Sequence, residues 1–527
     1  MPEPVTHDVD IAIVGSGFSG SLLAMIARRL GRSVLLLEKG HHPRFAIGES
    51  STPLTSLLLE ELAREYDLPR LLPLGKYGTW RRTYPDVGCG LKRGFSFFRH
   101  EAGLPFAADG SHRNQLLVAA SPHDDIGDVH WYRPDFDHFF VREAVTLGAK
   151  YLDGVELTAF SVEADGAHLT GRGLHVRARL VVDATGPRGF LHRLLSLGER
   201  ELPGLPPTQT LFSHFTGVRR FADVVPDAFD GTPPYAPDDA AVHHVFDGGW
   251  IWVLRFDNGI TSAGIAATAP LASELRLNEG RDGWQRLMAR FPSIGAQFAE
   301  ARPTREFTWW PRLAFFSDTM CGDRWVALPS AAGIVDPLLS TGFPLTLLGV
   351  QRVARALAED WDTPRLAERF RGYAARSATE LETTSRLVGA LYDAFGDWER
   401  FASLTFLYFA AASFAEAARR LGKTEVAGDT FMLGRHRTFA EALPHCLRLA
   451  AELHDEPVPA RREALLAAVS QAIAPVNVSG LADDARRNWY PAEAGDLLSG
   501  ADKLGATAPE VHAMLERCGF FAQPSIP

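Results

Sequence analysis

Residues 9–20 have the sequence VDIAIVGSGFSG, in which a β-branched apolar run leads into glycines spaced as Gly-x-Gly-x-x-Gly. Residues 21–30 continue in a pattern typical of a helix, and residues 33–37 form a second apolar run that ends at Glu38. A strand, a glycine turn, a helix and a second strand within about 30 residues make up a βαβ unit. The stretch therefore predicts a Rossmann-type fold of the α/β class with a dinucleotide at the glycine turn.

Each glycine of this turn has a separate physical task. Gly15 permits the tight turn, Gly17 lets the backbone approach a pyrophosphate, and Gly20 lets the helix pack closely on the strand. The N-terminus of the helix then faces the phosphate charge. Glu38 is placed to accept hydrogen bonds from ribose hydroxyls, and its charge disfavours a 2′-phosphate. The predicted cofactor site also takes in the neighbouring residues Phe18, Ser19 and Lys39.

The composition is that of a globular protein and excludes several classes. At 527 residues the chain exceeds the size of one core, so we expect two or three substructures. A net charge of -10 argues against nucleic acid as the natural ligand. No run of 18 apolar residues and no signal-peptide pattern appear, and four separated cysteines indicate reduced thiols, so we expect a cytoplasmic protein without a membrane span. Residues 401–415 are expected to form a buried helix rather than a membrane-surface patch, and no cluster has metal-ligand spacing.

Motifs far downstream of the glycine turn narrow the nucleotide to FAD. Residues 183–186 (DATG) end a late strand, and residues 322–326 (GDRWV) precede residues 333–337 (GIVDP). Together with a single glycine fingerprint, they resemble the glutathione-reductase-type flavin monooxygenase superfamily. No second Gly-x-Gly-x-x-Gly follows, so we expect no NAD(P)H domain. The resemblance implies FAD contacts from Arg133, Asp183, Gly186, Asp323, Asp336 and Pro337, although Arg133 also fits an ordinary surface arginine.

Strand-like and helix-like patterns divide the rest of the chain. Residues 154–182 alternate apolar and polar positions, which predicts an antiparallel ribbon. Strand-like runs dominate from 206 to 310, and helical patterns follow from about 345. We therefore expect a discontinuous FAD-binding domain (1–205 and 311–370), an inserted antiparallel sheet on the substrate side (206–310) and a C-terminal helical domain (371–527).

Three further stretches resemble the flavin-dependent halogenases, in particular the branch that acts on phenols. They are residues 42–50 (HPRFAIGES), 250–254 (WIWVL) and 336–342 (DPLLSTG). The resemblance implies that Glu49 and Ser50 contact the flavin and that Ser340, Thr341 and Gly342 hold a halide. The likeness extends over residues 89–97, 243–246 and 392–397.

Three positions depart from that family pattern. Leu254 and Arg255 replace an isoleucine and a proline, and Ile334 replaces an aromatic residue. These departures leave open a flavin monooxygenase or dehydrogenase on the same scaffold. A redox-silent flavoprotein that binds a partner through its helical domain is a second alternative.

The resemblance implies a catalytic lysine, for which Lys92 is the candidate. An amine can donate to hypohalous acid or, once deprotonated, form a haloamine, whereas a guanidinium stays protonated. Only 6 of the 54 basic residues are lysines, so a lysine in the apolar, glycine-flanked segment 89–97 is unusual for this chain. Desolvation there would lower its pKa. Lys76, in a glycine-flanked loop, is the rival, and simple packing of Lys92 at a strand edge is the plain alternative.

Aromatic side chains are the candidates for the substrate side. Trp250 and Trp252 alternate along a strand and share one face, whereas His243 and His244 point to opposite faces. Phe401 and Phe406 are predicted to wall the substrate pocket, although all four aromatics also fit plain core packing. No acid in the chain matches the glutamate that indole halogenases place near their lysine. We therefore expect a phenol rather than tryptophan as substrate.

The resemblance also implies the reaction and its partners. A separate flavin reductase would supply FADH2 by diffusion, and oxygen would convert it to a C4a-hydroperoxide. Chloride or bromide would attack that species, and the hypohalous acid would pass to Lys92. A helix N-terminus near the halide residues would favour the anion. The acceptor would be a small electron-rich aromatic, free or tethered to a carrier protein.

Overall fold

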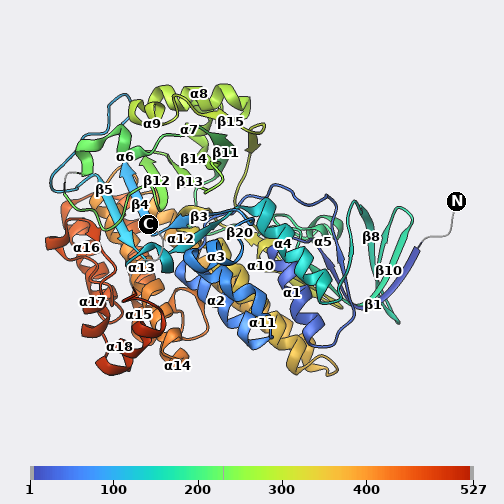
Figure 1. Ribbon diagram of the computed structural model, residues 1–527. Helices are drawn as coiled ribbons and strands as arrows, with labels where there is room; N and C mark the ends of the chain where they lie inside the picture. Colours follow the sequence, from blue (N-terminus) through green and yellow to red (C-terminus); the bar gives the residue numbers. More distant parts are fainter. Residues whose placement is uncertain (1–4, 230, 523–527) are drawn as a thin grey trace.

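The computed structural model describes residues 5–229 and 231–522 and contains two large sheets with helices around them (Figure 1). The glycine turn follows β1 of the first sheet. This sheet has eight strands in the order β18-β19-β10-β1-β2-β7, with β9 paired to β10 and β8 paired to β9. β1 pairs in parallel with β2 and β10, so the predicted βαβ unit is confirmed. The strands are β1 (Val5–Val14), β2 (Val34–Leu37), β7 (Lys150–Leu152), β8 (Leu157–Glu163), β9 (Gly166–Gly171), β10 (Leu174–Asp183), β18 (Cys321–Gly322) and β19 (Trp325–Ala327).

The second sheet has nine strands, and its two faces serve different cores. Along β13, Trp250 and Trp252 face the main core, whereas Ile251 and Val253 face a second core covered by α7 (Ala269–Glu274), α8 (Arg281–Arg290) and α9 (Pro292–Gln297) (Figure 1). This alternation follows from the period of two along a strand. The strands are β4 (Gly94–Arg99), β5 (Gln115–Ala119), β11 (Thr208–Thr216), β12 (Ala241–Phe246), β13 (Gly249–Arg255), β14 (Thr261–Thr268), β15 (Arg302–Pro303), β16 (Thr308–Trp310) and β21 (Trp489–Tyr490).

This second sheet draws on three parts of the chain. The predicted sheet region 206–310 supplies β11 to β16, while β4 and β5 come from residues 94–119 and β21 from residues 489–490. β3 (Cys89–Lys92) and β6 (Asp128–Trp131) form a separate antiparallel pair. The division of the chain into three domains therefore stays a prediction.

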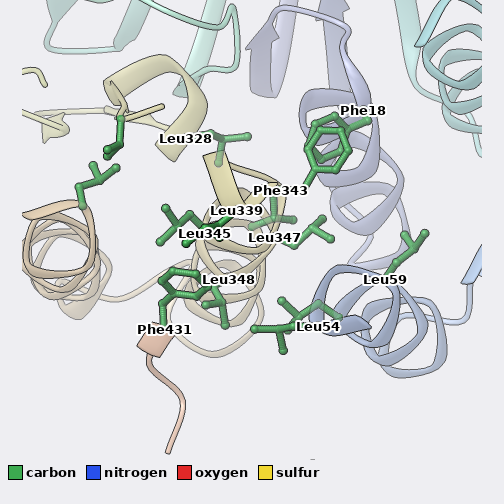
Figure 2. Packing of buried hydrophobic residues seen from close by; sticks show 14 of the residues in the cluster. Phe18, Leu54, Leu59, Leu328, Leu339, Phe343, Leu345, Leu347, Leu348 and Phe431 are labelled. Carbon is green, nitrogen blue, oxygen red and sulfur yellow. The ribbon is translucent and has the colours of Figure 1, made fainter. Parts of the chain in front are cut away.

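Helix α11 (Gly342–Glu359) runs through the main core. Figure 2 shows Leu347 and Leu348 of α11 among buried side chains from neighbouring elements, and Phe343 beside Phe18 of α1. The rings of Phe18 and Phe343 meet edge to face at 5.1 Å. The packing fixes the N-termini of α1 and α11 close to each other. Besides α11, the helices of this part of the molecule are α1 (Phe18–Arg29), α2 (Pro53–Glu65), α3 (Tyr77–Thr83), α4 (Arg133–Thr146), α10 (Pro329–Ala332) and α12 (Arg365–Tyr392).

The C-terminal helices pack around α13 (Trp398–Arg420). Among the described residues, α13 is the one helix long and apolar enough to cross a membrane, but 72% of its most apolar window is buried inside the molecule. The expected buried helix over 401–415 is therefore confirmed. The last hundred residues contribute β21 to the second sheet and three long helices: α15 (Arg437–Asp455), α16 (Pro459–Ile473) and α18 (Ala508–Arg517).

Candidate active site

The larger of two cavities described here, about 470 Å³ in volume, lies between the glycine turn, the N-terminus of α11 and the inner face of the second sheet. Segments that are far apart in the sequence line it. They are the glycine turn (17–19), residues 44–50, the turn after β10 (184–187), strand residues such as Trp250 and Trp252, and the loop before α11 (333–337 and 340–343). The cavity is therefore built at the edge where parallel strands end, as dinucleotide sites are.

The glycine turn has the close approaches that its spacing predicts. Gly15 has φ +100, and a Cβ there would lie 2.5 Å from the carbonyl oxygen of Ala184. A Cβ on Gly20 would lie 2.1 Å from the carbonyl oxygen of Gly15. No side chain caps α1, whose N-cap is Gly17, so its first backbone N–H groups are free for an anion. Phe18 and Ser19 line the cavity beside Gly17.

Glu38 is held by the protein's own donors at the end of β2. It accepts hydrogen bonds from the backbone N–H groups of Ser16 and Gly40 and from the Arg44 guanidinium. Burial by itself would raise the pKa of Glu38, but Arg44 and these N–H groups outweigh it and lower the pKa to about 2. The carboxylate is therefore charged at any working pH. Lys39 is exposed and pairs with Glu156.

Arg133 is a buried residue of the site and not a surface arginine. Its guanidinium makes two hydrogen bonds of 2.8 Å to Asp137, and Nη1 donates to the carbonyl oxygens of Ile47 and Gly48. It lies 5.1 Å from the ring centre of Phe18 and lines the larger cavity. Arg133 thereby fixes the segment 44–50 against the glycine turn.

Glu49 brings a buried carboxylate to the cavity wall. Its Oε1 lies 2.7 Å from Nε2 of His214 in β11. Its Oε2 is buried and has no hydrogen-bond partner among the described residues. Because buried acceptors are nearly always paired, this oxygen indicates a donor from a bound group. Ser50, the next residue, also lines the cavity.

The loop from Asp336 to Gly342 is held in an unusual backbone conformation. Leu339 and Ser340 have φ of 65° and 54°, and the N–H of Leu338 donates to Oδ1 of Asp336. Burial raises the pKa of Asp336 to about 7, against the opposing hydrogen bonds from Leu338 and Tyr392. Residues Pro337, Ser340, Thr341 and Gly342 line the cavity, and no side chain caps the N-terminus of α11.

Some predicted cofactor residues lie outside this cavity. Asp183 is buried, and its carboxylate accepts from Thr185 and from the N–H of Leu191, so it shapes the turn in which Gly186 lines the cavity. Asp323 is exposed in the hairpin between β18 and β19 and does not line it. Ser330, at the start of α10, does line the cavity, although no motif had pointed to it.

Lys92 ends β3 and is fully buried. Its Nζ donates to Oγ of Ser50 at 2.9 Å and to the carbonyl oxygen of Ser51 at 2.5 Å, and it lies 3.8 Å from the ring centre of Phe95. Asp128 of β6 is its direct cross-strand neighbour. Burial lowers the pKa of Lys92 well below its usual value, and the charge of Asp128 opposes that shift.

Lys92 itself lines neither the larger cavity nor a smaller one of about 150 Å³. Phe95, under the lysine amine, lines the smaller cavity, whereas Ser50, which accepts from the amine, lines the larger one. Lys76 is a lining residue of the smaller cavity. Most of its remaining wall comes from α13 and the C-terminal residues 478–520. The residues of α13 involved are Tyr408, Phe409, Ala412, Ser413, Glu416, Ala417 and Arg420.

Some of the predicted substrate residues line the larger cavity, and others are buried in the hydrophobic core. Trp250 and Trp252 both line the larger cavity, and the ring of His243 stacks on Trp250 at 5.1 Å. His244 faces the second core, as the alternation predicts, where it contacts His100 and Gln297. Phe401 and Phe406 are buried in the core and line neither of the two cavities, in contrast to Tyr408 and Phe409 of the same helix.

The sequence is similar to those of known flavoproteins. The family model of FAD dependent oxidoreductases matches residues 10–310. Monodechloroaminopyrrolnitrin halogenase PrnC of Pseudomonas fluorescens is 31% identical over 409 residues, which cover 75% of this chain and 70% of PrnC. The chain belongs to the flavin-dependent halogenase family. Tetracycline 7-halogenase of Kitasatospora aureofaciens is 29% identical, with 80% of this chain and 76% of that protein covered.

A solved structure has the same fold as this halogenase. Halogenase PltM, in complex with phloroglucinol and FAD, superposes with a TM-score of 0.79 at 23% identity, over 91% of this chain and 99% of that one. The α/β FAD-binding fold with its two sheets and C-terminal helices is therefore confirmed. The chain is an FAD-dependent enzyme.

The residues of the larger cavity suit FAD. Two uncapped helix N-termini converge on it, and the unpaired Oε2 of Glu49 offers an acceptor in its wall. A Cβ on Gly17 would have its nearest neighbour at 3.6 Å, so the turn is open on the cavity side. Of the departures from the family pattern, Leu254 and Ile334 line the cavity, whereas Arg255 donates to the carbonyl oxygen of Val218.

Proposed function

We propose that this halogenase uses reduced FAD, oxygen and chloride or bromide to halogenate a small phenolic aromatic in secondary metabolism, with Lys92 as the residue that transfers the halogen. The position of Lys92 carries this proposal. Its amine contacts Ser50, a wall residue of the larger cavity, and Phe95, a wall residue of the smaller one. The amine therefore lies between a wall residue of the larger cavity and a wall residue of the smaller one.

The larger cavity is the proposed flavin and halide side. Bound reduced FAD supplies the two electrons with which oxygen and halide give an electrophilic halogen. Gly15, Gly17 and Gly20 admit the pyrophosphate, and Arg133 holds the adjoining wall. The backbone around Ser340, Thr341 and Gly342 is suited to hold the halide, because the N-terminus of the 18-residue helix α11 favours negative charge.

Lys92 is suited to carry the halogen because burial lowers its pKa and raises the fraction of free amine. The amine takes the halogen from hypohalous acid, and the displaced hydroxide leaves as water with the amine proton. The ring carbon of the phenol then takes the halogen from Nζ, and the ring proton returns to the amine. Nucleophilic lysines in other enzymes are activated by desolvation in the same way.

The smaller cavity is the proposed site of the aromatic ring. Phe95, Tyr408 and Phe409 give it apolar walls, as small-molecule sites usually have. A phenol oxygen activates its own ring, so an apolar slot beside Lys92 suffices. PltM, which has this fold, was solved with the phenol phloroglucinol, and this supports the same substrate class here. A related chlorinase acts on a pyrrole-2-carbonyl group bound to a peptidyl-carrier protein. A substrate tethered to a carrier protein is therefore a variant of this proposal.

The proposed partner is a separate flavin reductase that supplies FADH2 by diffusion. The single glycine fingerprint supports this view, because it leaves no second nucleotide domain for NADH. The enzyme is therefore expected to consume NADH only when a reductase is added.

Mass spectrometry of products tests the function. The purified enzyme is incubated with NADH, a flavin reductase, chloride or bromide, and a panel that includes a resorcinol-type phenol and tryptophan. We expect a halogenated phenol whose mass changes with the halide. Oxygenated products without halogen would favour a monooxygenase, and chlorination of tryptophan alone would contradict the phenol assignment.

A further inference from the structure

Tyr392, the last residue of α12, links two walls of the larger cavity from behind. Its hydroxyl accepts a hydrogen bond from Nε1 of Trp250 at 3.1 Å and donates to Oδ2 of Asp336 at 2.9 Å. The other oxygen of Asp336 accepts from the N–H of Leu338. Trp250 and Asp336 line the cavity, whereas Tyr392 is buried behind them. One hydroxyl thus joins β13, α12 and the loop before α11.

The loop that this hydroxyl holds needs external support. Leu339 and Ser340 have left-handed backbone angles, which cost energy in residues other than glycine. Such a conformation persists only where the surroundings hold it. Asp336 begins the loop. Its Oδ1 accepts a hydrogen bond from Leu338 within the loop, and its Oδ2 accepts one from Tyr392 outside the loop. Tyr392 therefore connects this carboxylate to α12, beside the contact that Asp336 makes with Trp250 of β13.

Tyr392 is itself fixed by the segment 392–397. Its ring packs on Phe395 at 4.7 Å. At the other end of the segment, Asp397 caps α13 through the N–H of Arg400 and binds Arg462 of α16. The C-terminal helices thus hold Tyr392 in place.

We infer that Tyr392 is a positioning residue. It holds Trp250 and the loop from Asp336 to Gly342, the proposed halide site, in the arrangement that halogenation needs. The inference rests on the proposed function for the halide part only. A phenylalanine at 392 would keep the packing but would neither accept from Trp250 nor donate to Asp336.

Asp336 gives this role a signature that does not depend on turnover. Among the described residues, Tyr392 is the titratable group that interacts with Asp336, and the remaining partners are the neutral donors Leu338 N–H and Trp250. Burial raises the pKa of Asp336, and the Tyr392 hydroxyl lowers it. Loss of that hydroxyl therefore raises the pKa further. Because Asp336 lines the cavity, we expect its protonation to change the absorbance of FAD bound there.

The experiment compares Tyr392→Phe with Tyr373→Phe. Tyr373 lies on the same helix, is buried, and donates to the carbonyl oxygen of Ala327, away from the loop. In the FAD-loaded proteins, we expect Tyr392→Phe to move the midpoint of the absorbance change upward by about one pH unit, as one hydrogen bond to a charged group allows. We also expect it to raise the KM for chloride about tenfold with a smaller change in kcat. Tyr373→Phe should leave both at the wild-type values.

Identical behaviour of the two variants in the titration would overturn the inference. Should Tyr392→Phe fail to fold, Trp250→Phe removes a donor that serves both the Tyr392 hydroxyl and Asp336, and an upward shift of the midpoint is again expected. No shift would overturn the inference. If the wild-type protein forms no halogenated product, the proposed function fails, while the absorbance titration still decides the role of Tyr392.

Discussion

The larger and the smaller cavity, whose walls contact Lys92 through Ser50 and Phe95 respectively, are built in different ways. The larger cavity is made mostly of turns and helix N-termini, whose backbone groups and glycines meet at the edge of a parallel sheet. The smaller cavity is made of side chains from α13, from β4 and β5, and from the last fifty residues. The first construction suits the phosphates and charges of a nucleotide. The second suits an apolar ring, whose identity then depends on side-chain shape.

We therefore expect the two halves of the site to respond to different substitutions. Backbone space limits the larger cavity, so a single added methyl group is expected to abolish cofactor binding. Side-chain volume limits the smaller cavity, so substitutions there are expected to change the substrate range and leave the flavin chemistry intact.

The largest effect is expected for Gly20→Ala. The new Cβ would lie 2.1 Å from the carbonyl oxygen of Gly15 and 3.0 Å from Cβ of Ala184, so the turn must open. We expect FAD affinity to fall by about 100-fold or more, because the turn no longer fits the pyrophosphate. Gly372→Ala in α12 is the control: nothing lies within 4 Å of its Cβ, and alanine is expected to stabilise the helix by about 1 kcal/mol. Flavin fluorescence on titration measures both, and equal affinities would contradict the account.

A smaller effect is expected for Ala412→Trp. Ala412 lines the smaller cavity and is absent from the walls of the larger one, so the indole would occupy the proposed ring site. We expect the KM for the phenol to rise about tenfold, as loss of apolar binding space predicts. Oxidation of FADH2 by oxygen should keep its wild-type rate. If the rate of FADH2 oxidation fell together with the rate of halogenation, the two cavities would not be functionally separate.

The smallest effect is expected for Asp128→Asn, which should shift the pH dependence of the halogenation rate. Burial lowers the pKa of Lys92 and the Asp128 charge raises it, so the loss of that charge lowers the pKa further. If the free amine is the reactive form, halogenation rises with pH through this pKa, and the rise moves to lower pH by up to about one unit in the variant. An unchanged profile would contradict the coupling of the two residues.

Other titrating groups do not mimic this shift. The pKa values of His130 and His243 are lowered to about 3 by burial, so both are neutral at working pH. Asp336 titrates near neutrality, but its partners are Leu338, Tyr392 and Trp250 and do not include Asp128. Its contribution should stay in place when Asp128 is replaced.

The larger cavity was largely predictable from the sequence, because local motifs build it. The spacing of Gly15, Gly17 and Gly20 follows from backbone geometry alone, and the segments around Glu49 and Ser340 carry their own signatures. Asp323 shows the limit of this reasoning: its motif has the expected spacing, but the side chain lies exposed in a hairpin.

The smaller cavity was not predictable, because tertiary packing alone brings its residues together. A helical pattern could not tell that Tyr408 and Phe409 reach the cavity while Phe401 and Phe406 stay in the core. Asp128 lies 36 positions beyond Lys92, and only the pairing of β3 with β6 places the two side by side. Asp128 begins the short segment DVHW (128–131), and no motif of the sequence pointed to it.

The yield of halogenated phenol per FADH2 oxidised measures the proposed transfer of the halogen by Lys92. The yield is measured by mass spectrometry for the wild type, Lys92→Ala and Lys76→Ala at saturating phenol and chloride. We predict that Lys92→Ala oxidises FADH2 at a near wild-type rate but loses product by about 100-fold or more, the scale of a lost nucleophile or acid–base group. Lys76→Ala should keep most of its yield, because Lys76 does not line the larger cavity, where the electrophilic halogen is proposed to form. Wild-type yield from Lys92→Ala together with none from Lys76→Ala would contradict the account.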